Sequence, residues 1–117
     1  MIDYNVELNT SIDEQKMLNI NIKLFEKNTN ILFLENNVLV DINNEIIVNN
    51  FKNFIRDIKK NRDSYIIFPN IFLNVKFSYY NYFIIFKFSN EYNSLLFKIE
   101  ANDSIKNAFY HIEELLK

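Results

Sequence analysis

The chain has 117 residues, a formal net charge of −2 and an apolar fraction of 49%. Length and composition predict one folded domain over residues 1–117 and exclude intrinsic disorder. The charge provides no general attraction to nucleic acid or to an anionic membrane. Because the chain has no cysteine, disulfides, thiol catalysis and thiolate metal sites are excluded.

The sequence contains no glycine, whereas an average chain of this length has roughly eight. The residues in excess, led by 21 asparagines, have A/T-rich codons, which indicates a very AT-rich genome. Turns that need a positive φ must use other residues, and we expect asparagine or aspartate there. Glycine-rich phosphate loops and nucleophile elbows are excluded in their usual form.

The first part of the chain alternates apolar and polar residues, as half-buried strands do. We predict strands at residues 2–8, 18–24, 31–35, 38–42 and 45–48. A turn is expected at residues 27–30. Asn36 and Asn37 have the residue type of a two-residue type I′ turn between two strands, and Asn43 with Asn44 predicts another turn.

Two segments have the spacing of amphipathic helices. The first is predicted over residues 50–61, with Asn49 or Asn50 as its N-cap. The second follows Asp103, which we predict as its N-cap. The apolar stripe of the first helix is Phe51, Phe54, Ile55 and Ile58, and that of the second is Ile105, Ala108, Phe109, Ile112, Leu115 and Leu116.

Between these helices we predict a meander of antiparallel strands at residues 65–68, 71–77, 82–88 and 95–100. Four-residue loops at residues 78–81 and 90–93 would pair Val75 with Ile84 and Phe86 with Phe97. One face of this meander is apolar, and the other is mixed. The order of strands, helix, meander and helix predicts an α+β domain, with two amphipathic helices packed on one face of an antiparallel sheet of short strands.

No group of residues has the pattern of a catalytic or metal site. His111 is the only histidine, and we interpret it as structural because catalysis needs a base, an orienting group and a nucleophile together. Glu113 and Glu114 are adjacent on a helix, so their side chains point about 100° apart and do not converge on one ion. We expect no enzyme activity, no cofactor and no bound metal.

The candidate partner-binding residues lie on the meander and the last helix. They are the hairpin tyrosines Tyr79, Tyr80 and Tyr82, the mixed-face residues Phe72, Phe83, Ile85 and Leu96, and the acidic pair Glu113 and Glu114. Tyrosine is enriched at binding hot spots. In the alternative interpretation the tyrosines fold back over the sheet edge, and a homodimer or the N-terminal strands cover the mixed face. Lysines on this face resemble a nucleic-acid stacking platform, but we expect no direct nucleic-acid binding.

Residues 47–54 form a predicted strand that leads into a helix with two spaced phenylalanines. Strands at residues 73–77, 82–88 and 95–100 follow, and Asp103 with Ser104 opens a final helix that ends in Ile-Glu-Glu-Leu-Leu. Over residues 46–116 this succession resembles the WapI-type immunity family, small cytoplasmic proteins that neutralise a polymorphic toxin. The resemblance is carried by apolar patterns, and it implies no particular toxin-contacting residue.

We therefore expect a cytoplasmic, non-catalytic inhibitor that binds a cognate toxin, with acidic residues opposing a basic nuclease. The alternative is a phage or mobile-element protein that blocks a host defence nuclease, as anti-CRISPR proteins do. A ligand-binding or catalytic domain would need a polar cluster that we do not find. The longest apolar stretch, residues 82–88, is short and is interrupted by Lys87, so we expect no membrane insertion.

Overall fold

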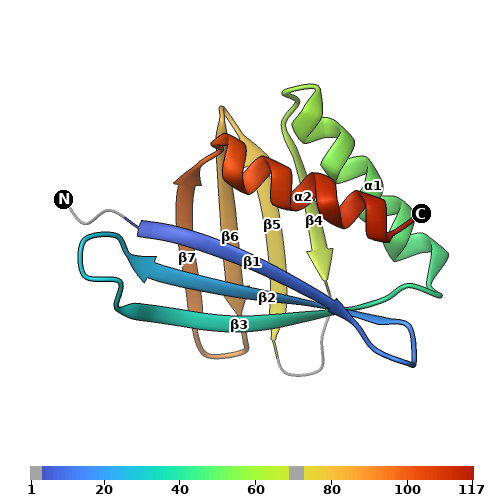
Figure 1. Ribbon diagram of the computed structural model, residues 1–117, viewed down its shortest axis with the longest axis horizontal. Coiled ribbons are helices and arrows are strands. Elements are labelled where there is room, and N and C mark those ends of the chain that lie inside the picture. Colours follow the sequence, from blue (N-terminus) through green and yellow to red (C-terminus); the bar gives the residue numbers. More distant parts are fainter. Residues whose placement is uncertain (1–3, 69–72) are drawn as a thin grey trace.

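The computed structural model describes residues 4–68 and 73–117, which form an α+β fold with two antiparallel sheets and two helices (Figure 1). The first sheet has the strand order β1-β2-β3, and the second has the order β4-β5-β6-β7. The elements are β1 (Tyr4–Ile12), β2 (Met17–Glu26), β3 (Leu32–Asp41), α1 (Glu45–Lys59), β4 (Ser64–Phe68), β5 (Asn74–Tyr80), β6 (Phe83–Ser89), β7 (Ser94–Glu100) and α2 (Asp103–Leu115). The predicted fold class is confirmed, but the strands form two sheets rather than one.

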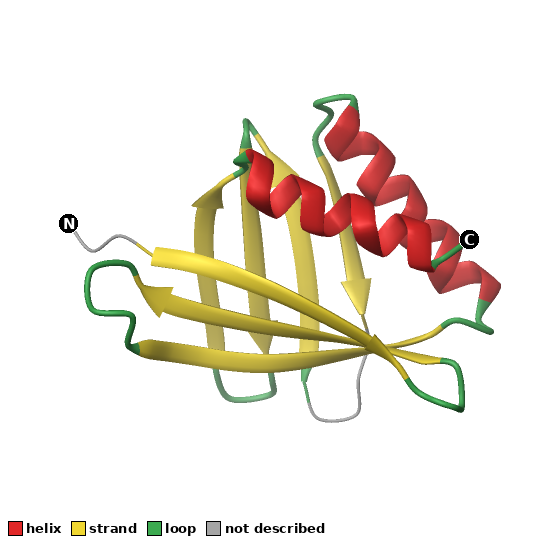
Figure 2. Cartoon of the chain, in the orientation of Figure 1, coloured by secondary structure: helices red, strands yellow, loops and turns green. Residues whose placement is uncertain are grey.

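The four-stranded sheet is one layer of the molecule, and the first sheet and both helices form the other (Figures 1 and 2). The strands of the first sheet run across those of the second, and α2 lies beside β1 and runs towards α1. Both helices and the first sheet therefore lie on one face of the four-stranded sheet. The opposite face has no covering element within the part of the chain that the structure describes.

The core lies between these layers and is centred on Phe77 of β5, which is fully buried. Its ring packs edge-to-face against the rings of Phe51, Phe68, Phe86 and Phe109, with ring centroids 5.1–6.4 Å apart. These partners come from α1, β4, β6 and α2, so one side chain contacts four elements. The inner face of the four-stranded sheet contributes Ile66, Phe68, Val75, Phe77, Tyr79, Ile84, Phe86 and Phe88, all buried.

The predicted turn at Asn36 and Asn37 is wrong, because both residues lie within the continuous strand β3. Asn37 pairs with Asn21 of β2, and the Asn21 side-chain amide donates to Asn37 Oδ1 (3.0 Å) and Glu35 Oε1 (2.9 Å). Inward and outward positions alternate without a break through Asn36, which occupies the inner position between Leu34 and Val38. The two asparagines therefore take part in cross-strand pairing instead of reversing the chain.

The strand predicted at residues 45–48 is also wrong, because this segment is the first turn of α1. Asn44, and neither Asn49 nor Asn50, is the N-cap, and its side-chain oxygen accepts hydrogen bonds from the N–H groups of Ile46 (3.1 Å) and Ile47 (3.3 Å). The run of three β-branched residues resembles a strand in composition. The cap and the burial of Val48 in line with the helical stripe outweigh that preference.

The hairpin between β5 and β6 differs from the predicted four-residue loop. Tyr80 pairs directly with Phe83, so the turn consists of Asn81 (φ 50°) and Tyr82 (φ 69°) alone. Positive φ at both positions is the requirement of a type I′ turn. Val75 consequently pairs with Phe88 instead of Ile84, whereas the predicted pairing of Phe86 with Phe97 is confirmed.

Among the residues that the structure describes, five have a positive φ, and three of these are asparagines, which confirms their expected use in place of glycine at Asn30, Asn61 and Asn81. The other two, Lys16 and Tyr82, depart from that expectation. Asn61 ends α1 in a Schellman motif, in which its own N–H and that of the next residue donate back into the helix. The turn after β2 and the four-residue loop after β6 are confirmed, and the N-cap of α2 is Asn102, one residue before the predicted Asp103.

The N-cap of α1 gives a first prediction. Asn44→Ala should lower the free energy of unfolding by about 1 kcal/mol, because it removes the acceptor of two helix N–H groups. Asn49→Ala is the matched control and should be neutral or slightly stabilising, because that exposed position lies inside the helix, where alanine is favoured. Urea denaturation measures both variants, and equal losses would contradict the assignment of the cap.

The turn after β5 gives a second prediction. Tyr82→Gly should be more stable than Tyr82→Ala by about 0.5–1 kcal/mol, because glycine adopts the positive φ of this position without a steric penalty. The two variants remove the same exposed side chain, so their difference isolates the backbone. Thermal denaturation provides the comparison, and an alanine variant at least as stable as the glycine variant would argue against the type I′ turn.

Candidate functional site

The exposed side of the four-stranded sheet, which we call the outer face, combines large apolar side chains with lysines. Its apolar and lysine side chains are Tyr65, Ile67, Lys76, Tyr80, Phe83, Ile85, Lys87, Leu96 and Lys98, and Ser78 and Glu100 lie on the same face. The strand register places them in rows across all four strands; one row runs from Tyr65 through Ser78 and Ile85 to Lys98. The four strands are paired with one another and their other face packs on the core, so the outer face is held in a fixed arrangement.

Two of the three outer-face lysines lie over aromatic rings. The Lys76 ammonium is 4.7 Å from the centroid of the Tyr65 ring, and the Lys98 ammonium is 4.2 Å from that of Phe83. Such contacts stabilise the ammonium over the ring and keep the charge at the surface. Glu100, paired with Phe83, places a carboxylate on the same face. The outer face is therefore positively charged in a chain whose net charge is negative.

The exposed side of the first sheet has a different composition. Asn21 bridges Glu35 and Asn37 there, and the surrounding outward positions on β1 and β2 include Glu7 and Lys23. Leu39 is an exposed apolar residue on this side. The two sheets thus expose a mainly polar surface and a mainly apolar, basic surface.

Most candidate residues of the meander lie on or beside the outer face. Tyr80 and Leu96 are 58% and 57% exposed, and Phe83 and Ile85 are half-buried between neighbouring strands. Tyr82 is exposed at the turn. Phe72 lies outside the described residues.

Tyr79 does not belong to an exposed hairpin tip, so its predicted place in a loop is wrong. The two-residue turn extends β5 to Tyr80 and directs Tyr79 into the core, where it is 1% exposed. Its hydroxyl donates to Asn61 Oδ1 at 2.5 Å, which connects the end of α1 to the sheet. Burial raises the pKa of the Tyr79 phenol above its ordinary value. This side chain is a structural element and not part of a contact surface.

The two candidate glutamates have different environments. Glu113 is 6% exposed and accepts a hydrogen bond from Lys59, and Arg56 Nε lies 3.6 Å from its second oxygen. It therefore connects α2 to α1, and its predicted exposure to a partner is wrong. Glu114 is exposed and forms an ion pair with Lys117 at 3.0 Å.

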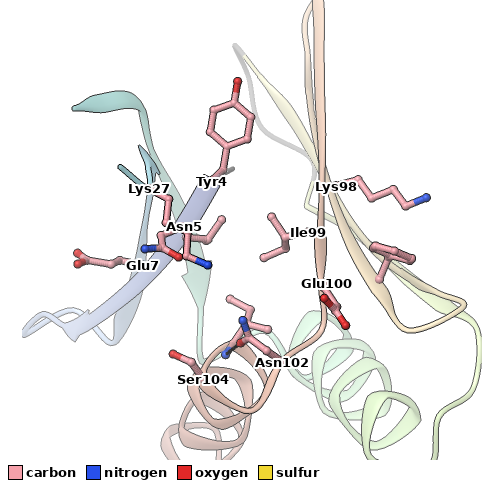
Figure 3. Close-up of a pocket in the computed structure, with 12 residues that line it drawn as sticks. Tyr4, Asn5, Glu7, Lys27, Lys98, Ile99, Glu100, Asn102 and Ser104 are labelled. Carbon is pink, nitrogen blue, oxygen red and sulfur yellow. Dashed lines mark hydrogen bonds between the residues drawn. The ribbon is translucent and has the colours of Figure 1, made fainter. Parts of the chain in front are cut away.

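A cavity of about 670 Å³ lies between β1 and β7, each of which is an edge strand of its sheet (Figure 3). Ile99 points into this space from β7, whereas Lys98 points away from it to the outer face. Asn102 and Ser104 at the start of α2 lie at one end of the cavity. A second, mainly apolar cavity of about 460 Å³ is lined by Tyr4, Leu24, Phe33, Leu34 and residues 95–98.

Two parts of this region were not predicted from the sequence. Tyr65 and Ile67 of β4 belong to the outer face, and the alternation of residues 64–68 could have placed them there. Tyr4 and Phe33 of the first sheet line the apolar cavity together with residues 95–98 of β7. These residues are far apart in the sequence, so no local pattern indicates their proximity.

The described residues contain no group of three or more histidine, cysteine, aspartate or glutamate side chains placed to hold a metal ion. His111 is exposed on α2. Neither of the two helices in this part of the chain is long and apolar enough to cross a membrane.

Comparison of the chain with protein-family models, with curated proteins and with solved structures found no match. The resemblance to the WapI-type immunity family therefore stays a prediction from the order and spacing of apolar residues.

The environment of Glu113 gives a third prediction. Glu113→Gln should lower the free energy of unfolding by about 1–3 kcal/mol, because it removes the carboxylate that accepts the hydrogen bond of Lys59 in a nearly buried position. Glu114→Gln, at the adjacent exposed position, should change it by less than about 1 kcal/mol. Denaturant titration of both variants tests this difference, and equal effects would refute a specific role of Glu113 between the helices.

Proposed function

We propose that the protein is a non-catalytic inhibitor that binds another protein through the outer face and neutralises it by occlusion. The observation that carries the proposal is the composition of this face: tyrosine, phenylalanine, isoleucine and leucine from four paired strands lie uncovered on one side of the described fold. Monomeric proteins rarely expose extended apolar patches that have no binding role. In line with the sequence resemblance, the partner that we propose is a toxin.

The aromatic contacts favour a protein partner over a single-stranded nucleic acid. Binding of a nucleic-acid strand to a sheet depends on aromatic rings whose faces are free to stack on bases. On the outer face, Lys76 covers the Tyr65 ring and Lys98 covers the Phe83 ring. A base would have to displace an ammonium group at each of these positions.

The charge of the outer face indicates the chemistry of the partner. Lys76, Lys87 and Lys98 outnumber the single carboxylate of Glu100. Complementary charge speeds association and disfavours wrong partners. We therefore infer that the partner has an acidic rim around an apolar contact area. This replaces the expectation that acidic residues of the present chain oppose a basic nuclease, because Glu113 is used between the helices.

The outer face gives a fourth prediction. The double variant Tyr80→Ala/Leu96→Ala should fold normally but bind the partner about 2 kcal/mol more weakly, the scale of an interface hot spot. Leu39→Ala is the matched control, because Leu39 is 58% exposed on the other sheet. Affinity capture with the wild-type chain identifies the partner, and titration calorimetry and inhibition of the partner's activity then compare the variants.

Retention of affinity by the outer-face variant, or an equal loss in Leu39→Ala, would refute the outer face as the binding surface. A partner that binds but keeps its full activity would refute inhibition. Binding of single-stranded nucleic acid that is lost in Tyr65→Ala would instead identify the face as a stacking platform.

A further inference from the structure

The edge of β7 has the geometry of a strand-binding site. β7 pairs with β6 on one side only, and its other side faces the cavity between β1 and β7 (Figure 3). The other edge of this sheet is different, because α1 packs against β4. An uncovered apolar edge strand can pair with another extended chain.

The hydrogen bonds at the two ends of the β6–β7 ladder show which backbone groups are directed away from it. Ala101 N–H donates to the Tyr82 carbonyl (2.9 Å), and Asn90 N–H donates to the Asn93 carbonyl (2.8 Å). Residues 93 and 101 therefore both lie at hydrogen-bonded positions of the ladder. Because these positions alternate in an antiparallel pair, the N–H and C=O groups of Leu96 and Lys98 and the N–H of Glu100 point away from β6. The Glu100 carbonyl already accepts a hydrogen bond from the Asn102 N–H (2.9 Å).

We propose that this edge binds an extended segment of the partner protein as a fifth strand of the four-stranded sheet. The proposal deepens the proposed function and rests on it, since the segment belongs to the protein that contacts the outer face. Backbone hydrogen bonds to Leu96, Lys98 and Glu100 hold the segment, and side-chain contacts on the two faces select its sequence.

The surroundings of β7 specify the side chains of the bound segment. A residue opposite Lys98 places its side chain on the outer face, where a carboxylate pairs with the ammonium. A residue opposite Phe97 points to the other side, towards the apolar cavity of about 460 Å³. The segment therefore alternates apolar residues, directed into the cavity, with polar residues that include an acidic one.

Charge disfavours a second copy of this chain as the occupant. Antiparallel pairing of two β7 strands would form one continuous sheet and gather Lys76, Lys87 and Lys98 of both copies on the same face. Like charges on neighbouring strands repel each other. An acidic segment from a different protein would instead place carboxylates near these lysines, and the opposite charges would attract each other.

The test uses the full chain and a short peptide, matched to β7 in length, that alternates valine with glutamate. Amide hydrogen exchange, followed by NMR, should slow by about tenfold or more at Leu96, Lys98 and Glu100 when the peptide binds. The amides of Phe97 and Ile99, which already face β6, should change little. A control peptide with lysine in place of glutamate should bind about tenfold more weakly.

Two variants at one position separate the backbone from the charge. Lys98→Pro removes an N–H directed away from the sheet, where proline is tolerated, and should abolish peptide binding. Lys98→Ala keeps this N–H and should retain binding, but it should lose the preference for the glutamate peptide. The wild-type exchange data test the proposal even if Lys98→Pro does not fold.

Unchanged exchange at Leu96, Lys98 and Glu100 with the peptide in excess would overturn strand addition. So would protection of the same amides that increases with protein concentration without peptide, because that result identifies a second copy as the occupant. Either result leaves the proposed function testable, since the Tyr80→Ala/Leu96→Ala comparison measures binding of the whole partner. If the proposed function is wrong, the Tyr80→Ala/Leu96→Ala variant will bind the partner with unchanged affinity.

Discussion

The packing of four aromatic rings around Phe77 is the interaction on which the rest of the molecule depends. Each ring comes from a different element, so Phe77 fixes α1, α2 and two strands relative to β5. Edge-to-face ring pairs add about 0.5–1.5 kcal/mol each beyond the burial of their area. The two helices are therefore held on the inner face of the four-stranded sheet. The remaining apolar residues of the meander are left on the outer face, on a scaffold that loses little entropy when it binds.

The faces of the meander could be predicted from the sequence even though its first hairpin could not. Val75 pairs with Phe88 instead of Ile84, a shift by an even number of residues, so each side chain keeps its face. The same shift lengthens β5 and moves Tyr79 from a loop into the core. The error arose because a tyrosine at positive φ, Tyr82, has no turn signal in its residue type.

The candidate site could be predicted only where it depends on alternation within one strand. Ile85 and Leu96 were assigned to the mixed face correctly, because side chains in a strand alternate between its faces. The environment of Glu113 could not be predicted, since Lys59 is distant in the sequence and approaches it only through the packing of α2 on α1. The exposure of the β7 edge could not be predicted either, because it depends on where the first sheet packs in the fold.

The position of α2 after all the described strands affects how the protein folds during its synthesis. Every strand pairs with a strand adjacent in the chain order, so both sheets can form as hairpins soon after they leave the ribosome. α2 contributes Phe109 and Ile112 to the core and packs against α1 and β1, yet it is synthesised after all of them. Until α2 emerges, the inner face of the meander is partly exposed on a nascent chain. Aggregation competes with folding in that state, which lasts until α2 has left the ribosome and packed on the core.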